Sequence, residues 1–186
     1  MEFTRQHSPW MLELENVGRE GDRIRIVKMK GMEGKGKQGV ALLSVYGHQR
    51  KEEEEVESFF EEMIQRTRRL QKEGWIVMAL GDFNVEWKMG TDKRKKHGQT
   101  AMTKWKEKCR IQRIGPSKEA TKGVTFIGGE KGHSEIDHAM TDGRTEKFSL
   151  ETCRMGRIRT GHAQLIVTID TEKRVKTQAQ AHKRKP

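Results

Sequence analysis

Three short polar segments flank apolar runs of the sequence, and their side chains are of types that activate water or bind anions. The first, Gly81-Asp82-Phe83-Asn84, directly follows the apolar run 75–80. An aspartate can orient or deprotonate a water molecule, and an asparagine two residues later can hydrogen-bond that water or an anionic oxygen. By itself the tetrapeptide also fits a turn in which the Asp and Asn side chains bind their own backbone.

The other two segments carry a carboxylate and an imidazole. Ser134-Glu135-Ile136-Asp137-His138 sets Asp137 in an apolar context, where a buried carboxylate needs a partner. Gly161-His162 precedes the last apolar run, 165–169. A histidine there could contact an anionic oxygen, and a carboxylate behind it would fix its tautomer and keep it positively charged. Alone, His162 reads as an ordinary surface histidine, so the indication comes from the three segments together.

Strands that could position these segments are predicted from the apolar pattern. Alternation predicts a half-buried strand over 23–29, and continuous apolar runs predict buried strands over 39–46 and 75–80. The glycine-rich stretch 31–39 is typical of a hairpin turn or loop. Shorter runs predict three further strands, over 124–127, 135–140 and 165–169.

The clearest helix is predicted over 51–73, where apolar residues recur with i, i+3, i+4, i+7 spacing. Acidic residues crowd its first turns and basic residues its last, as the helix dipole favours, and Gly74 is a C-terminal stop. A basic loop is expected over 88–98 and a second, short helix over 99–109. Residues 1–21 show no clean period and are expected to be irregular. Residues 171–186 are polar and basic, and are expected to be disordered.

The motifs, in this order, resemble the endonuclease/exonuclease/phosphatase family, most closely the endonucleases of non-LTR retrotransposons. Residues 80–84 resemble its Gly-Asp-Phe-Asn motif, and Val124-Thr125-Phe126 with residues 134–138 resembles its Thr-Phe…Ser-x-Ile-Asp-His/Tyr stretch. Thr160-Gly161-His162 stands where the family has Ser-Asp-His, and Val45-Tyr46-Gly47 where it has Val-Tyr-Ala-Pro. The resemblance covers 22–170, which we expect to form the domain.

The resemblance implies an α+β fold of two packed, mixed β-sheets flanked by helices, as in DNase I. It also implies that Asp82 activates the attacking water and that Asn84 holds this water or a phosphate oxygen. Tyr46 would hydrogen-bond the phosphate, and His162, with Asp137 as its partner, would stabilise charge on the phosphoryl oxygens. Members of this family usually hydrolyse phosphoester bonds with Mg²⁺, a hard cation that prefers oxygen ligands.

The sequence departs from the family at the residues that bind metal. The family's early Asn and its metal-binding Glu have no match, so the chain is expected to be N-terminally truncated. Glu13 and Glu15 lie in that region, but in no matching motif. Gly161 replaces the Asp of Ser-Asp-His, which in the family lies on the metal side of the site. We therefore expect Mg²⁺ as the cofactor but an incomplete metal site, whose ligands the sequence leaves unknown.

Composition indicates the partner. The 186 residues suffice for one domain, and the net charge of +11, with mean hydropathy −0.93, favours polyanions such as nucleic acid. Lys93, Arg94, Lys95 and Lys96 are candidates for binding substrate phosphates. No apolar run approaches the roughly 20 residues of a membrane span. Two cysteines exclude a disulfide scaffold, and a reducing, intracellular compartment, nuclear or cytoplasmic, is expected.

Three functions remain open at this point. The first is a metal-dependent phosphodiesterase of endonuclease type that acts on DNA or RNA, DNA being favoured, with weak or no activity as this isolated chain. The second is a non-catalytic, nucleic-acid-binding remnant of such an endonuclease. The third is a phosphatase for a small phosphorylated molecule, against which the Ser-x-Ile-Asp-His form and the basic charge argue.

Overall fold

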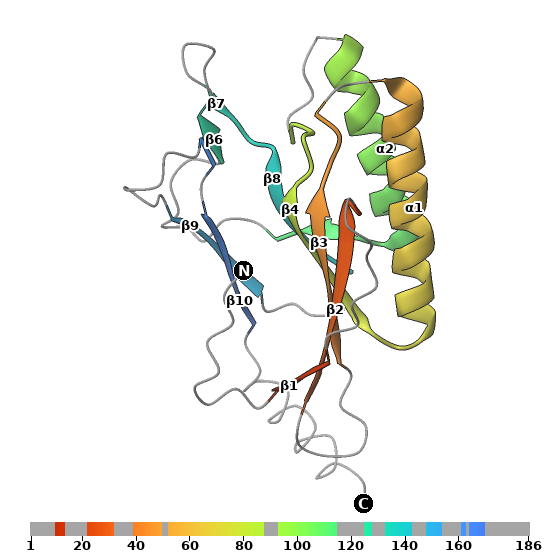
Figure 1. Cartoon of the computed structure of the whole chain (residues 1–186), viewed down its shortest axis with the longest axis vertical. Coiled ribbons are helices and arrows are strands. Elements are labelled where there is room, and N and C mark those ends of the chain that lie inside the picture. Colours follow the sequence, from red (N-terminus) through yellow and green to blue (C-terminus); the bar gives the residue numbers. More distant parts are fainter. Residues whose placement is uncertain are drawn as a thin grey trace, which may run out of the picture.

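The computed structural model centres on a mixed β-sheet of six strands in the order β1-β2-β3-β4-β8-β5 (Figure 1). It describes residues 10–13, 22–31, 39–49, 52–87, 93–114, 125–127, 133–142, 148–153, 161–162 and 164–169. The strands of this sheet are β1 (Trp10–Glu13), β2 (Ile24–Gly31), β3 (Val40–Tyr46), β4 (Ile76–Asp82), β8 (Asp137–Thr141) and β5 (Gln112–Arg113). Strands β3 and β4 are parallel, and every other neighbouring pair is antiparallel.

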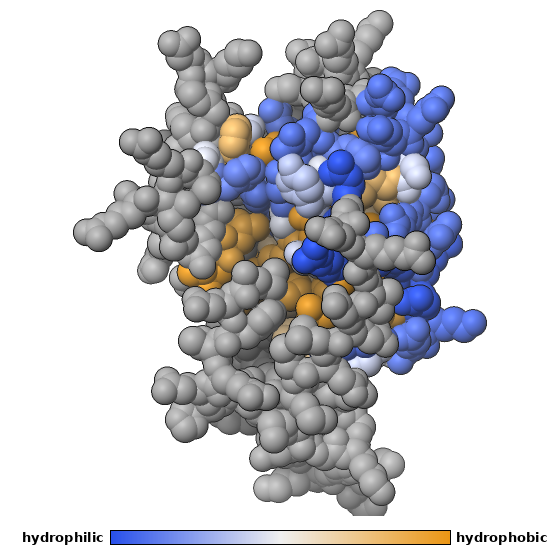
Figure 2. Space-filling model, in the orientation of Figure 1, coloured by the Kyte–Doolittle hydropathy of each residue, from blue (hydrophilic) through white to orange (hydrophobic). Residues whose placement is uncertain are grey.

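Two helices cover one face of this sheet. Helix α1 (Glu53–Lys72) is the crossover between the parallel strands β3 and β4, and α2 (Lys93–Cys109) lies beside it (Figure 1). The predicted period of α1 is confirmed, because its apolar positions from Val56 to Leu70 are all buried. They pack on alternate residues of the strands, such as Leu43 and Val77. Hydrophilic side chains cover the helical side of the molecule (Figure 2).

A second layer lies against the other face. Strands β9 (Phe148–Cys153) and β10 (Gln164–Ile169) form an antiparallel pair, and Val167 of β10 packs on a cluster that includes Leu42 and Met78. These residues alternate with those that face the helices, since successive strand side chains point to opposite faces. The predicted architecture of two packed β-sheets with flanking helices is thereby confirmed. A small pair, β6 (Phe126–Ile127) and β7 (His133–Ser134), joins this side through a bridge from Phe126 to His162.

The structure corrects several predicted elements. Residues 10–13 were expected to be irregular, but they form β1, whose backbone pairs with β2. The prediction of a basic loop over 88–98 is wrong from Lys93 onward, because Lys93 to Lys96 form the first turn of α2. The strand predicted at 135–140 begins at Asp137, and β5, β7 and β9 were not predicted at all. Residues 88–92 and 171–186 lie outside the described residues.

No helix among the described residues is both long and apolar enough to cross a membrane.

Candidate active site

Strand register gathers the polar residues at one end of the central sheet. Asp82, the last residue of β4, is paired with Asp137 of the antiparallel strand β8 and with Tyr46 of the parallel strand β3. Because strand side chains alternate, Asp82 shares the face of Leu80, which packs against β10. Asp137, the cross-strand partner of Asp82, lies on that same face. His138 faces the helix layer instead and packs against Phe83.

Two glycines allow the close packing at these strand ends. Gly81 has φ +143°, and a Cβ there would lie 2.0 Å from the carbonyl oxygen of Val45. A Cβ on Gly47 would lie 2.2 Å from the carbonyl oxygen of Phe83. No real Cβ atom approaches a backbone oxygen so closely, so any other residue would push apart the two strand ends that carry Tyr46 and Asp82.

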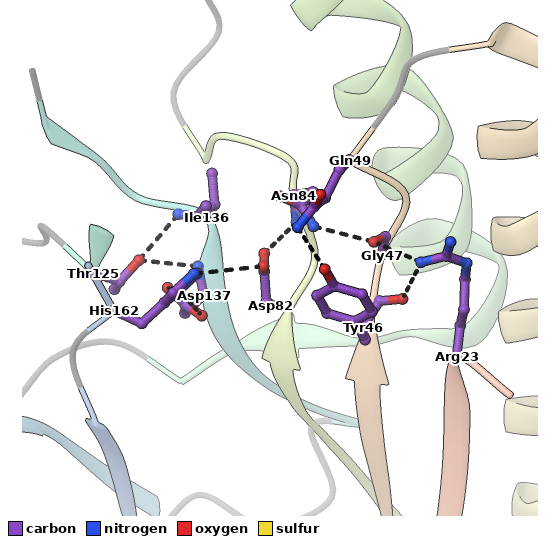
Figure 3. Close-up of polar contacts among 10 residues, drawn as sticks. All are labelled: Arg23, Tyr46, Gly47, Gln49, Asp82, Asn84, Thr125, Ile136, Asp137 and His162. Atoms are coloured by element: carbon purple, nitrogen blue, oxygen red, sulfur yellow. Dashed lines mark hydrogen bonds and ion pairs between the residues drawn. The ribbon is translucent and has the colours of Figure 1, made fainter. Parts of the chain in front are cut away.

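Asn84 is held by the turn that follows Asp82. It adopts φ +51°, in the left-handed region that Asn tolerates better than most residues. Its backbone N–H donates to Oδ1 of Asp82 at 2.8 Å, and its side-chain Nδ2 donates to the carbonyl of Gly47 at 3.1 Å. The turn thus fixes Asn84 next to the carboxylate (Figure 3).

His162 lies between the two aspartates. Its Nδ1 is 3.1 Å from Oδ2 of Asp137, and its Nε2 is 4.0 Å from Oδ2 of Asp82 (Figure 3). The ring also contacts Phe126, with 4.7 Å between the ring centroids. Asp137 in turn is positioned by Thr125, whose hydroxyl oxygen accepts the backbone N–H groups of both Ile136 (3.1 Å) and Asp137 (2.9 Å).

The site disfavours the charged form of Asp82. Burial raises the pKa of this carboxyl above its ordinary value of 3.8, and the nearby charge of Asp137 raises it further. The hydrogen bond from Asn84 and the proximity of His162 act in the opposite direction and lower the pKa. A carboxylate with a raised pKa in a polar cluster is the kind of group that accepts a proton during catalysis.

Tyr46 stands at the solvent-facing edge of the cluster. It is 47% exposed, and its hydroxyl accepts a hydrogen bond from Nε2 of Gln49 at 2.5 Å. The guanidinium of Arg23 lies over the Tyr46 ring, 5.5 Å from its centroid, and donates to the carbonyl of Gly47. Neither Arg23 nor Gln49 belongs to a sequence motif. The contacts of Arg23 exist only once β2 and β3 pair, whereas Gln49 contacts Tyr46 locally, from three residues further along the chain.

Of the residues predicted from the sequence, Asp82, Asn84, Asp137 and His162 come together in one cluster, and Tyr46 lies at the same end of the sheet. The side chains of Lys93 to Lys96 lie outside what the structure describes. His138, adjacent to Asp137, is fully buried, and its Nε2 lies 2.7 Å from the carbonyl oxygen of Val85. Burial lowers the pKa of His138 to about 4.

Asp82, Asp137 and His162 form a group that could hold a metal ion. Each offers one ligand atom, and these atoms lie within 4.8 Å of one another. Two carboxylates and one imidazole fit a divalent cation, although the nitrogen ligand suits Mn²⁺ or Zn²⁺ better than Mg²⁺. Within the described ranges, no other group of three such residues meets the same geometry.

Solved structures show which fold this is. No model of a protein family matches the sequence, and no curated protein matches it. Among solved structures, the 3′-5′ exonuclease NExo from Neisseria meningitidis matches with a TM-score of 0.61 and 13% identity, over 87% of this chain and 70% of that one. An endonuclease/exonuclease/phosphatase family protein from Leptotrichia buccalis C-1013-b matches with a TM-score of 0.52 and 14% identity, over 78% and 53%.

The chain has the endonuclease/exonuclease/phosphatase fold. The endonuclease domain of TRAS1, a telomere-specific non-LTR retrotransposon, shares this fold with a TM-score of 0.57 and 14% identity, over 81% of this chain. The chain spans 64% of that domain. The resemblance inferred from the motifs is therefore confirmed at the level of the fold.

Proposed function

We propose that the chain is a nuclease-type phosphodiesterase that acts on nucleic acid, DNA rather than RNA. The observation that carries the proposal is the cluster of Asp82, Asn84, Asp137 and His162 at the end of the central sheet. It combines a carboxylate that can take a proton, an amide beside it and an imidazole paired with a second carboxylate. These groups are what hydrolysis of a phosphoester requires.

Each residue has a role in the proposed reaction. Asp82 takes the proton of a water molecule whose oxygen attacks phosphorus, while the bond from phosphorus to the leaving oxygen breaks. Asn84 orients this water. His162, whose Nδ1 faces Asp137, places Nε2 on the side of Asp82, where a phosphoryl oxygen would carry negative charge. Tyr46 contributes a hydroxyl to the same oxygens.

A divalent cation would support this chemistry. Asp82, Asp137 and His162 are the described residues that would hold it, with Mg²⁺ as the expected ion, and His162 would then be a ligand of the ion rather than the contact to a phosphoryl oxygen. When bound, it would neutralise charge on the phosphoryl group. Because the described acidic, histidine and cysteine residues offer only three ligand atoms here, one of them a nitrogen, we propose that hydrolysis by this chain is weak.

Charge supports nucleic acid as the substrate. The first turn of α2 consists of four basic residues, Lys93, Arg94, Lys95 and Lys96, although the helix dipole disfavours positive charge at that end. Helix α1 follows the dipole rule, with Glu53, Glu54 and Glu55 in its first turn. The exception in α2 is explained if these residues bind phosphates. One solved NExo structure holds a product DNA hairpin.

The test is a nicking assay on supercoiled duplex and on abasic DNA, with Mg²⁺ or Mn²⁺, for the wild-type chain, Asp82→Ala and His162→Ala. We expect slow cleavage that EDTA abolishes and that both substitutions reduce by about 10²-fold or more. A surface variant, Glu61→Gln, serves as the control. Cleavage that persists unchanged in Asp82→Ala would contradict the proposal.

The second candidate is a nucleic-acid-binding protein without catalysis. The observation that favours it is Gly161, which stands next to His162 where the resemblance places an acidic residue. It predicts salt-sensitive binding to DNA with no cleavage under any metal. The same assay, run beside a binding titration, distinguishes the two functions.

A further inference from the structure

A pocket opens on the helix side of the turn that carries Asn84. Its volume is about 120 Å³, and it lies between the N-terminal parts of α1 and α2 and the segment that follows β4. Glu53 lines it from α1, His97 from α2, and Asn84 from the turn. Asn84 lines this pocket and also hydrogen-bonds Asp82 of the proposed catalytic cluster, so this residue connects the two sites.

The pocket has an apolar floor and a polar rim. Phe59, Phe60 and Val85 line the floor and are each less than 10% exposed. The rim includes the carboxylates of Glu53 and Glu86 and the imidazoles of His48 and His97. An aromatic floor with a few polar groups around it is the usual composition of a site for a flat organic ring.

His97 makes only long ion-pair contacts with the described residues around it. Its Nδ1 is 3.9 Å from the carboxylate of Glu53, and its Nε2 is 3.7 Å from that of Glu57, so both distances exceed a hydrogen bond. Nε2 is buried and, among the described residues, has no hydrogen-bond partner. Such a group costs stability unless something binds it, and a ligand in the pocket could do so.

The volume of the pocket and the charge of its rim limit the kinds of ligand that it can bind. A volume of about 120 Å³ is well below the roughly 300–1,000 Å³ of pockets for drug-sized ligands, so one ring system is the appropriate size. The rim carboxylates would repel a phosphate but would accept hydrogen bonds from an amino group. Adenine, cytosine and guanine carry an exocyclic amino group, whereas thymine and uracil do not.

We propose that this pocket binds a nucleobase with an exocyclic amino group, from the nucleotide whose phosphate occupies the catalytic cluster. The inference rests on the proposed function. A base can enter the pocket only when it is out of the helical stack, so the nucleotide bound at this position is single-stranded, terminal or flipped out of a duplex. This specifies the substrate class beyond a general action on nucleic acid.

The test is a calorimetric titration of the full chain, with Mg²⁺ present, using deoxyadenosine, thymidine and deoxyribose 5′-phosphates as probes. We expect the adenine nucleotide to bind about tenfold more tightly than deoxyribose 5-phosphate, which is the range for one stacked base, and thymidine monophosphate to gain much less. Equal affinity for all three probes would contradict the proposal that the pocket binds a base, but it would not contradict the proposed function. If none of them binds, and inorganic phosphate does not bind either, both proposals fail.

Two variants show where the base binds. Gly98→Leu adds a side chain at the pocket wall, where a Cβ would lie 3.1 Å from Val85, and it improves helix propensity. It should remove the tenfold advantage of adenine while the affinity for deoxyribose 5-phosphate stays unchanged. Glu53→Gln should reduce the advantage, and its matched control is Glu61→Gln on the same helix, where Glu61 pairs with Lys108. An adenine advantage that survives in Gly98→Leu would overturn the proposal.

Discussion

Asp82 and Asp137 face each other as directly paired residues of β4 and β8, and His162 contacts both carboxylates. Like charges opposite each other across a strand pair destabilise a sheet. The arrangement is tolerated because the imidazole lies between the carboxylates and because Asn84 and Thr125 donate or accept hydrogen bonds around them. This pair therefore combines a local cost in stability with the chemistry proposed for the site.

Replacing Asp82 by Asn is expected to stabilise the fold at neutral pH while it abolishes hydrolysis. Burial raises the pKa of Asp82, so the folded state holds the proton more tightly than the unfolded state does. The stability of the wild type therefore falls as the pH rises from about 3.8 through the raised pKa, and the full cost is present at pH 7. Asn keeps an acceptor for the N–H of Asn84 and removes the charge.

Thermal unfolding measures this effect. We expect Asp82→Asn to raise Tm at pH 7, where each kcal/mol gained corresponds to about 2–4 °C in a domain of this size. The difference should shrink below pH 3.8, where the wild-type carboxyl is protonated in both states. A variant less stable than the wild type at pH 7 would contradict the electrostatic account.

His138 is expected to make the fold sensitive to acid. The carbonyl of Val85 can only accept, so Nε2 of the neutral ring must donate the 2.7 Å hydrogen bond. Burial lowers the pKa of His138 from 6.5 to about 4, so the unfolded state binds the proton first as the pH falls. Stability is complete above pH 6.5 and is lost progressively down to about pH 4, by about 3 kcal/mol in total.

Denaturant unfolding between pH 4 and 7 checks this prediction. His138→Gln keeps a donor for the carbonyl of Val85 and does not titrate, so its stability should vary less across this range. Identical pH profiles for the wild type and His138→Gln would show that another group causes the acid sensitivity.

Thr125 is expected to be a positioning residue for Asp137. Thr125→Val keeps the shape of the side chain but leaves the N–H groups of Ile136 and Asp137 without their acceptor. An unpaired buried N–H costs roughly 1–3 kcal/mol, so we expect a loss of about 2–4 kcal/mol in the free energy of unfolding. Thr125→Ser keeps the hydroxyl and should lose much less. Equal losses in Val and Ser, measured by urea unfolding, would mean that packing rather than hydrogen bonding is responsible.

The first turn of α2 is expected to dominate the salt dependence of DNA binding. Replacing Lys93, Arg94, Lys95 and Lys96 by Gln should lower the slope of log K against log salt concentration by about 3–4, because each phosphate contact contributes about 0.9. The measurement is a fluorescence anisotropy titration at several salt concentrations. A double variant at the far end of α1, Arg69→Gln with Lys72→Gln, should leave the slope unchanged. If the quadruple variant has the same slope as the wild type, these four residues do not contact phosphate.

Local patterns explain which elements could be predicted. Helix α1 was predictable because its buried residues follow one helical face over about four turns. Strands β3 and β4 were predictable because both of their faces are largely buried and apolar. The first turn of α2 was predicted as a loop because its residues are all charged and opposed to the helix dipole. It is helical because residues further along the same helix, such as Met102 and Trp105, pack into the core with α1. Strand β5 contains only two residues, too few to show a period.

The sequence by itself determined the residue types, their order and the strand ends at which they occur, and this was enough to indicate the fold. Only the tertiary structure decided that Asp82 lies opposite Asp137, that His162 reaches both and that a pocket opens beside Asn84. The physical reason is strand register, because a slip of one residue would turn these side chains to the other face of the sheet. The raised pKa of Asp82 results from burial and from the charge of Asp137, which lies far away in the sequence, and no local pattern records either of them.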